Sequence, residues 1–339
     1  MSTENPFAAL LRERKRLVAD GGMGTSLFEL GLQPGGTPEA WNVERPDLIA
    51  SVHQSFVDAG SDIILTNTFG GTRARLDLDG LGDRVRELNA AGVAVARGVA
   101  DAAPRTVVVA GSVGPTGALF EPLGELTHET AVALFSEQVE ALAEAGADVI
   151  WIETLSSTEE LAAAVEAAAL SGLPIVTTMS FDTHGKTMMG VPPARLATWW
   201  RDSGLSAAAV GSNCGIGPAD VVRAVAEIHE TDPDVVVVAK ANCGVPQIIE
   251  GTLWYPSSSD TMTDYAELAL DAGARIVGAC CGSIPEHIAQ IREVVDTYEK
   301  ADSFDASQVE PRLGGASPLP KSEPRERRRR RRDTAESSA

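Results

Sequence analysis

The chain has 339 residues, of which 44% are hydrophobic, so it is long enough to bury a sizeable core, and its length alone would permit two domains. Its net charge of −20 argues against a nucleic-acid partner, and no run reaches the roughly 18 apolar residues that a membrane-spanning helix needs. Four cysteines are too few for a disulfide framework in a chain of this length and point instead to a metal or to catalysis.

The N-terminal segment MSTENPFAALLRERKRL places its charged residues after a short apolar patch. A secretory signal has the opposite order. We therefore expect a cytoplasmic protein.

Eight short runs rich in Val, Ile and Ala follow one another along the chain, and segments with helical patterns lie between them. The runs are Arg16–Asp20, Asp62–Phe69, Thr106–Ser112, Asp148–Thr154, Pro174–Phe181, Ala207–Cys214, Asp234–Asn242 and Arg275–Cys281. Their continuous apolar character is typical of strands that are buried on both faces of a parallel sheet. Between them, Glu129–Glu144 has apolar residues at helical spacing. Eight strand–helix units predict an α/β fold with a single (β/α)8 TIM barrel over residues 1–300, and a doubly wound open sheet is the alternative.

The pattern stops near residue 300. Residues 301–339 are rich in Pro, Ser and Gly, and they include Arg325, Glu326 and the run Arg327–Arg332. Nine Lys and Arg stand against seven Asp and Glu there, so the first 300 residues carry a net charge of −22. This composition predicts a disordered tail. Its arginines could contact RNA, an anionic surface or the acidic body of the protein, or could simply be solvated.

Polar and reactive residues gather where the predicted strands end. The segments are Asp20-Gly21-Gly22, Thr66-Asn67-Thr68-Phe69, Gly111-Ser112, Glu153-Thr154, Asn213-Cys214, Asn242-Cys243 and Cys280-Cys281-Gly282. The carboxyl ends of barrel strands are where this fold places its active site. We therefore expect these residues to form one site.

Three of the cysteines, Cys214, Cys280 and Cys281, are suited to a catalytic Zn²⁺ site, because thiolates select zinc and three protein ligands leave a fourth position open. Cys280 and Cys281 are adjacent and would point to opposite faces of a regular strand, so both can bind one metal only if the strand is distorted. Passive core cysteines, a strained disulfide between the adjacent pair, and a structural four-cysteine site that includes Cys243 are the alternatives. The helix after Cys281 is expected to begin with Ser283 as its N-cap.

Two acids also end apolar runs. Asp20 and Glu153 are either structural partners of nearby groups or acceptors for a substrate ammonium group, with the N–H groups of Gly21 and Gly22 facing its carboxylate. The glycines of the segment from Gly111 to Gly117 have a spacing that fits a nucleotide-binding loop poorly.

Taken together, the strand-end segments resemble those of the homocysteine S-methyltransferase family. The matching segments are Asp20–Thr25, Thr66–Phe69, Gly111–Thr116, Ile152–Thr154, Ser212–Pro218 and Gly278–His287. This family includes betaine–homocysteine methyltransferases and the homocysteine-binding domain of cobalamin-dependent methionine synthase, and the resemblance covers roughly residues 12–297. It implies a barrel whose zinc is held by Cys214, Cys280 and Cys281, with the homocysteine sulfur in the open position and its amino group held by Asp20 and Glu153.

For the methyl donor, the resemblance favours glycine betaine. Gly282 resembles the betaine and cobalamin branches, whereas the S-methylmethionine branch typically has Arg there. The segments Phe28–Leu32, Pro38–Asn42 and Ser180–Gly190 look most like bacterial proteins of the betaine type. Trp41 could then face the quaternary ammonium group, or it could be an ordinary packing residue. The tyrosines of the animal betaine enzymes are replaced here by Gly70 and Thr154. The alternative donors are a methylcorrinoid on a separate protein, S-methylmethionine and dimethylsulfonio compounds. A zinc-thiolate binding protein without turnover is the non-enzymatic alternative, and a homo-oligomer is expected.

Overall fold

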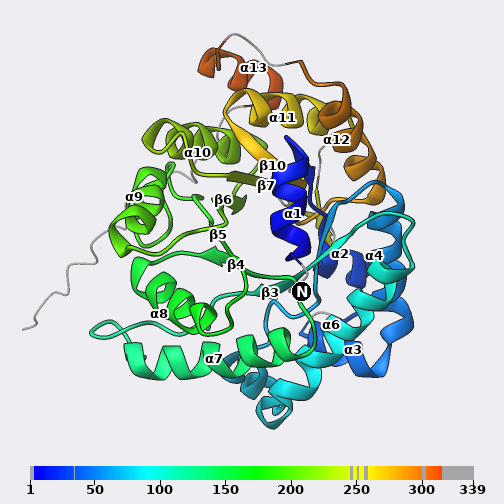
Figure 1. Cartoon of the computed structure of the whole chain (residues 1–339), viewed down its shortest axis with the longest axis vertical. Coiled ribbons are helices and arrows are strands. Elements are labelled where there is room, and N and C mark those ends of the chain that lie inside the picture. Colours follow the sequence, from blue (N-terminus) through cyan, green and yellow to red (C-terminus); the bar gives the residue numbers. More distant parts are fainter. Residues whose placement is uncertain are drawn as a thin grey trace, which may run out of the picture.

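The computed structural model describes residues 4–33, 35–244, 247–249, 252–255, 259–299 and 303–314. Eight parallel strands form one sheet in the order β1-β10-β7-β6-β5-β4-β3-β2 (Figure 1). These strands are β1 (Leu17–Val18), β2 (Ile63–Leu65), β3 (Val108–Val113), β4 (Val149–Leu155), β5 (Ile175–Met179), β6 (Ala209–Cys214), β7 (Val237–Ala241) and β10 (Ala274–Ala279). A parallel bridge between Ala19 and Ile63 joins the two ends of the sheet, so the predicted barrel is confirmed and the open sheet is not formed.

Helices follow the strands and surround the barrel, as Figure 1 shows. The α-helices are α1 (Pro6–Glu13), α2 (Met23–Glu29), α3 (Trp41–Glu44), α4 (Pro46–Asp58), α5 (Arg73–Leu76), α6 (Val85–Ala102), α7 (His128–Glu144), α8 (Thr158–Ala169), α9 (Pro193–Ser203), α10 (Pro218–Thr231), α11 (Ser259–Asp271), α12 (Pro285–Thr297) and α13 (Val309–Leu313). Short 3₁₀ turns cover Pro38–Ala40, Asp77–Asp79, Gly82–Arg84 and Ala306–Gln308. A hairpin of β8 (Gln247–Ile249) and β9 (Thr252–Trp254) interrupts the connection from β7 to α11.

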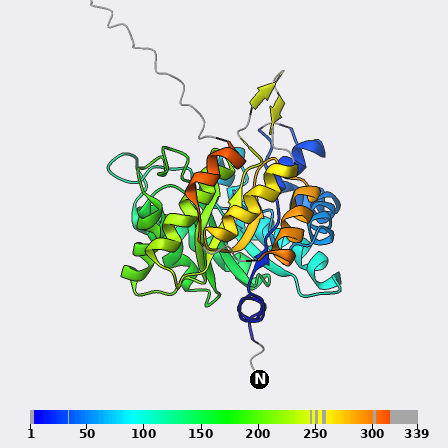
Figure 2. The ribbon, with the colours of Figure 1, turned by 90° about the horizontal axis from the view of Figure 1, so that it is seen from above.

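The lower part of the barrel interior is apolar and closed. Side chains at alternate strand positions, such as Val149 and Trp151 on β4, form a buried cluster there, as the period of two along a strand requires. Phe7 and Leu10 of α1 are buried in the same cluster. Figure 2 shows α1 beneath the barrel and the β8–β9 hairpin at the opposite end. The amino-terminal end of the barrel is therefore plugged, and the carboxyl ends of the strands form its mouth.

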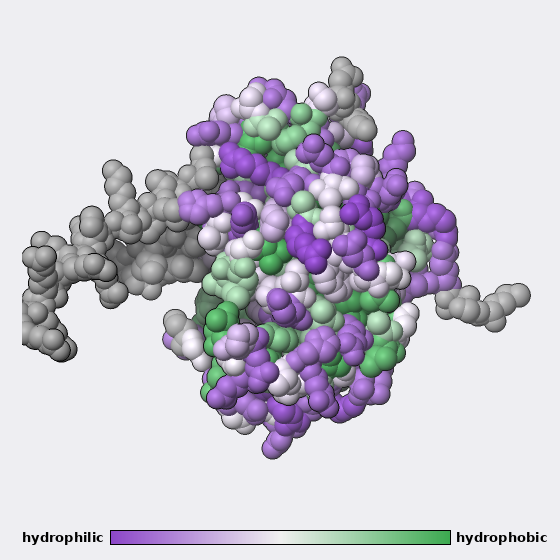
Figure 3. Space-filling model, turned by 90° about the vertical axis from the view of Figure 1, so that its left-hand side faces the viewer, coloured by the Kyte–Doolittle hydropathy of each residue, from purple (hydrophilic) through white to green (hydrophobic). Residues whose placement is uncertain are grey.

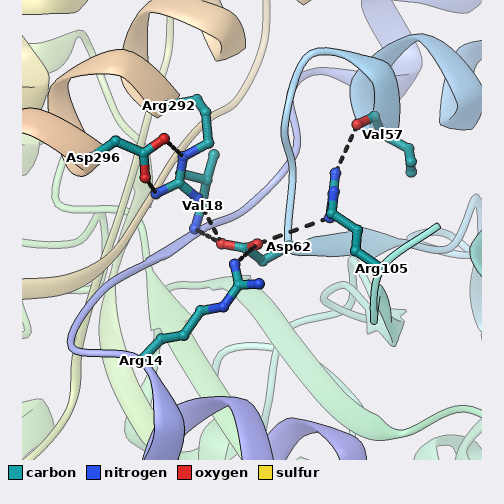
Figure 4. A network of polar contacts seen from close by, with 7 residues as sticks. All are labelled: Arg14, Val18, Val57, Asp62, Arg105, Arg292 and Asp296. Atoms are coloured by element: carbon teal, nitrogen blue, oxygen red, sulfur yellow. Dashed lines mark hydrogen bonds and ion pairs between the residues drawn. The ribbon is translucent and has the colours of Figure 1, made fainter. Parts of the chain in front are cut away.

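A buried carboxylate fixes the seam between β1 and β2. Asp62, only 1% exposed, lies just before β2 and accepts a hydrogen bond from the Val18 backbone N–H at 2.9 Å. Arg14 and Arg292 approach its two oxygens at 2.6 and 2.9 Å (Figure 4). Arg105 lies 3.8 Å away and donates to the carbonyl of Val57. One residue thus links the segment after α1, β1, α12 and the segment before β3.

On the side of the molecule shown in Figure 3, hydrophilic side chains predominate and the hydrophobic ones form small patches between them. Within the described residues, no helix combines the length and apolar character that crossing a membrane requires.

Two local predictions were wrong. Helix α12 begins after Ile284 rather than after Ser283, because the Ser283 hydroxyl is already bonded to the Cys280 carbonyl and to the Gly22 N–H. Residues 303–314, assigned to the disordered tail, are ordered. Val309 is fully buried there, and Arg312 pairs with Asp264 and Glu267 of α11. The rest of the predicted tail, with the arginine run, lies outside the described residues.

Candidate metal centre and substrate site

A layer of polar side chains lies above the apolar barrel interior. On β3, β4, β6 and β7 the inward positions continue in steps of two from buried apolar residues to Ser112, Glu153, Asn213 and Lys240. All four are buried. We refer to these four residues as the polar layer. A barrel core does not need polar groups at this level, so their presence marks the site.

The structure brings Cys214, Cys280 and Cys281 together at the barrel mouth. Cys214 is the last residue of β6, while Cys280 and Cys281 directly follow β10, and β7 lies between these two strands. The three sulfur atoms all lie within 4.8 Å of one another, and the Sγ atoms of Cys214 and Cys280 are 3.2 Å apart. We call these three residues the cysteine cluster. All four cysteines of the chain are free thiols.

Backbone distortion allows adjacent cysteines to face one point, as the sequence predicts. The Cys280 N–H bonds the Ala241 carbonyl at 2.7 Å, but the Cys281 N–H bonds the Asn242 side chain at 3.0 Å, so the regular ladder has ended. The next residue, Gly282, has φ +77°, and Cys214 itself has φ +59°. Such angles favour glycine and are costly for cysteine, so at Cys214 the fold holds a strained conformation that orients its thiol.

Hydrogen bonds within the cysteine cluster shift the pKa values of its thiols in opposite directions. Those from Cys214 and Cys280 hold the pKa of Cys281 well below its ordinary value, whereas bonding to Cys280 and Cys281 raises the pKa of Cys214. Tyr255, which follows β9, also contributes a hydrogen bond that lowers the pKa of Cys281. The cluster therefore favours the thiolate at Cys281, the form of cysteine that binds metals, while the pKa of Cys214 and that of Cys280 are raised.

Cys243 lies beside the cysteine cluster but is not one of its three members. Its thiol is fully buried, 3.2 Å from Nδ1 of His287, and its backbone N–H bonds the Cys281 carbonyl. Nδ1 of His287 also accepts the Ile284 N–H, so it is an acceptor and the Cys243 thiol is the donor. Cys243 therefore has a partner of its own.

Asp20 and Glu153 are both buried, but their partners differ. The Oδ1 atom of Asp20 lies 2.6 Å from the ammonium group of Lys240, and Oδ2 accepts the Leu65 N–H at 2.7 Å. One oxygen of Glu153 accepts a hydrogen bond from the Ser112 hydroxyl at 2.6 Å. Burial, and then the proximity of Cys280, raises the pKa of Glu153 to about 7, while Lys240 opposes this shift.

The remaining predicted residues are placed as follows. The Gly22 N–H donates to the Ser283 hydroxyl at 2.8 Å, and a Cβ at Gly21 would lie 2.4 Å from that same oxygen, so close packing requires glycine there. Trp41 is half-buried in α3, and the guanidinium group of Arg45 lies 5.6 Å from the centre of its ring.

Comparisons with known proteins agree with this geometry. The sequence profile of the family described as homocysteine S-methyltransferase matches residues 17–295, which is most of the chain. The chain belongs to the homocysteine S-methyltransferase family.

Among solved structures, the homocysteine methyltransferase MmuM from Escherichia coli, in its metallated form, superimposes with a TM-score of 0.73. It is 27% identical, with 85% of this chain and 99% of that one covered. The methionine synthases of Mycobacterium tuberculosis and Mycobacterium leprae are both 29% identical, over 84% and 82% of this chain. The matched region is only 25% and 24% of those proteins, so this chain spans about a quarter of their length.

Two residues near the site, Lys240 and Tyr255, were not predicted from the sequence. Lys240 stands inside the apolar run of β7, two positions after the inward-facing Val238, and that spacing could have revealed it. Tyr255 comes from the connection after β9, whose path no periodic pattern predicts.

Proposed function

We propose that this chain is a zinc-dependent homocysteine S-methyltransferase that forms methionine, with glycine betaine as the favoured methyl donor. The observation that carries the proposal is the cysteine cluster at the mouth of a barrel of this family. Three thiols that converge within 4.8 Å, on strands fixed by the sheet, are a donor set suited to one Zn²⁺ ion with a fourth position open. A reaction of reduced thiols also fits a cytoplasmic location.

Zinc bound by these three cysteines would keep a substrate thiol deprotonated at neutral pH, where a free thiol of pKa about 8.5 is only a few per cent ionised. The methyl transfer then forms a bond between the substrate sulfur and the methyl carbon and breaks the bond from that carbon to the donor nitrogen. The product is a thioether, and the donor leaves with the electron pair of the broken bond.

The residues of this chain orient the substrate. Within the polar layer, Glu153 lies near Lys240 and also near Asp20 and Cys280. The acidic groups of Asp20 and Glu153 would attract the amino group of homocysteine. Thr154, at φ +63°, is held by two hydrogen bonds to the Asn213 side chain. Asn213 thereby fixes the end of β4, where Glu153 is located.

The donor assignment rests on the sequence resemblance to betaine-type proteins. Trp41 is proposed to face the quaternary ammonium group of betaine, as aromatic rings attract cations; its ring has the Arg45 guanidinium group 5.6 Å from its centre. A methylcorrinoid on a separate protein is the second candidate donor. It is favoured by the methionine synthase relatives, in which three quarters of the protein lie outside the matched region.

The decisive experiment measures methionine formation from homocysteine by the purified, zinc-loaded chain, with betaine, a dimethylsulfonio compound, S-methylmethionine or methylcobalamin in separate reactions. Cys281→Ala is the test variant and Cys243→Ala the matched control. Turnover with betaine that is lost only in Cys281→Ala supports the proposal. Turnover with methylcobalamin alone reassigns the donor. Zinc binding without turnover with any donor contradicts the enzymatic function.

A further inference from the structure

A tyrosine from outside the barrel strands reaches the cysteine cluster. Tyr255 follows β9, is half-buried, and donates a hydrogen bond to the sulfur atom of Cys281. Its hydroxyl is also close enough to Cys214 and Cys280 to interact with the charge of their sulfur atoms. A phenol hydroxyl is thus part of the immediate surroundings of the three thiols.

The residue next to Cys281 makes room for this ring. A Cβ atom placed on Gly282 would overlap Cβ and Cγ of Tyr255, so a larger residue there would displace the ring. The φ of +77° at Gly282 independently favours glycine. The Cys281 backbone is fixed on both sides, because its N–H bonds the Asn242 side chain and its carbonyl accepts the Cys243 N–H. The thiol of Cys281 and the ring of Tyr255 are therefore held at defined positions.

The hydrogen bond from Tyr255 differs from those within the cysteine cluster in the group that supplies its proton. Within the described part of the chain, the sulfur atoms of Cys214 and Cys280 have each other and Cys281 as hydrogen-bond partners. Those bonds need a thiol proton, and cysteine binds a metal as the thiolate. A phenol, with an ordinary pKa of about 10, keeps its proton at neutral pH. Metal binding would therefore remove the hydrogen bonds between the thiols and leave the one from Tyr255.

The need to satisfy the hydroxyl does not account for this bond. A half-exposed hydroxyl can bond to water, and sulfur is a weak acceptor. A hydrogen bond to a metal-bound thiolate, in contrast, withdraws electron density from the sulfur, and such partners orient the ligands and tune the metal. The three cysteines would then be unequal ligands, because Cys281 alone keeps a hydrogen-bond donor among the described residues.

We propose that Tyr255 is a positioning residue of the metal centre: its hydroxyl holds the Cys281 sulfur and makes it the weakest electron donor of the three zinc ligands. This inference rests on the proposed function, because it requires that the cysteine cluster binds zinc. With less negative charge on its protein ligands, the metal accepts a fourth, substrate thiolate more readily.

The test measures the metal centre itself and needs no methyl donor. The full chain is loaded with Co²⁺, whose sulfur-to-metal charge-transfer absorption reports the electron density on the thiolates. Tyr255→Phe removes the hydroxyl but keeps the ring that packs on Gly282. Tyr298→Phe is the matched control, because it removes a tyrosine hydroxyl that bonds Asp271. Competition with a chelator gives the Zn²⁺ affinity of each protein, and denaturant unfolding checks that the variants are folded.

We expect the charge-transfer band of Tyr255→Phe to move to longer wavelength, because the Cys281 sulfur then donates more strongly. Its Zn²⁺ affinity should fall by about tenfold, as is typical when the hydrogen-bond partner of a metal ligand is removed. The band and the Zn²⁺ affinity of Tyr298→Phe should match those of the wild type. A band of Tyr255→Phe at the wild-type wavelength would overturn the inference, as would an equal shift in Tyr298→Phe.

Failure of the proposed function has a different signature. A wild type that shows no charge-transfer band with Co²⁺ would contradict the metal centre, and the inference with it. The same spectra with homocysteine added separate the two proposals. A band that shifts in Tyr255→Phe but does not respond to homocysteine in the wild type would support the role of Tyr255 and contradict thiol activation.

Discussion

Several buried polar residues in this barrel have a hydrogen-bond or ion-pair partner, and that partner determines what their removal does. Cys243 bonds His287, Asp20 bonds Lys240 and Leu65, and Asp62 bonds its arginines. Others lack one: within the described part of the chain these include the Ser61 and Thr72 hydroxyls, the Trp151 indole N–H and both ring nitrogens of His53, which is fully buried on α4.

Cys243→Ala should leave metal binding intact. Its thiol bonds His287 and is not among the three sulfur atoms of the cysteine cluster. Loss of that hydrogen bond and of the buried sulfur should lower the free energy of unfolding by about 1–2 kcal/mol. Metal analysis of the purified variants checks the first point and denaturant unfolding the second. A zinc content that fell as far as in Cys281→Ala would show that Cys243 is a ligand.

His53 should make the fold sensitive to mild acid. Burial lowers its pKa from 6.5 to about 4, so below pH 6.5 the unfolded chain binds a proton that the folded chain does not. Stability from the neutral ring is full above pH 6.5 and is lost as pH falls toward 4. Relative to His53→Leu, the wild type should lose about 2 kcal/mol between pH 7.5 and 5.

Denaturant midpoints of the wild type and His53→Leu across this pH range provide the measurement. His184→Asn, at an exposed position whose φ of +53° asparagine tolerates, is the control and should follow the wild type. Parallel pH profiles for the wild type and His53→Leu would contradict the assignment.

The position of single residues could be predicted where reactive side chains stand at the ends of recognisable strands. The three cysteines stand at the ends of apolar runs, so the strands that were evident in the sequence also placed the thiols. Lys240 was not found, because one charged residue in the run Val235–Ala241 reads as an interruption unless the inward-facing alternation is followed from Val238. Ser283 was misassigned as a cap, because its hydroxyl bonds groups that are distant in sequence or on the preceding loop.

Among the elements, the shortest strands form the seam of the barrel. β1 has two residues and β2 has three, and one isolated bridge joins them. The ladder hydrogen bonds are supplemented there by the side chain of Asp62, whose position just before β2 lets it accept the Val18 N–H. The sequence predicted both strands, but it contained no sign that arginines as distant as Arg292 would complete the seam.

Asp62→Asn should weaken this seam strongly. The substitution removes the charge that compensates Arg14 and Arg292, and breaking a buried pair by removing one partner costs about 3–5 kcal/mol. Thermal and denaturant unfolding give the magnitude. Asp58→Asn is a matched control, because Asp58 lies four residues earlier and is exposed at the end of α4, and it should change stability by less than about 0.5 kcal/mol. Equal effects of the two substitutions would contradict the role of the seam.

At the scale of the whole molecule, the boundary between barrel and tail lies further along the chain than composition indicates. Residues 303–314 are polar and proline-containing, which favours disorder, but Val309 finds a buried site and Arg312 finds two acids on α11. Long-range contacts of this kind outweigh local composition, and composition cannot reveal them.

Truncation after residue 302 should therefore lower stability by about 2–3 kcal/mol, through the lost burial of Val309 and the unpaired acids Asp264 and Glu267. Truncation after Gly314 should leave the melting temperature unchanged, as the predicted disorder of the remaining tail requires. The two melting temperatures are compared with that of the full chain. A large loss on removing residues 315–339 alone would show that this tail stabilises the barrel.

Because α1 closes one end of the barrel, it affects the order in which substrates bind to the proposed site and products leave it. Phe7 and Leu10 of α1 close the amino-terminal end of the barrel, so among the described residues the proposed site is approached from the mouth. In the proposed reaction the homocysteine sulfur binds at the cysteine cluster with its amino group toward the buried Glu153, and the donor approaches from the mouth. We therefore expect an ordered mechanism: homocysteine binds first, the demethylated donor is released before methionine, and methionine is released last.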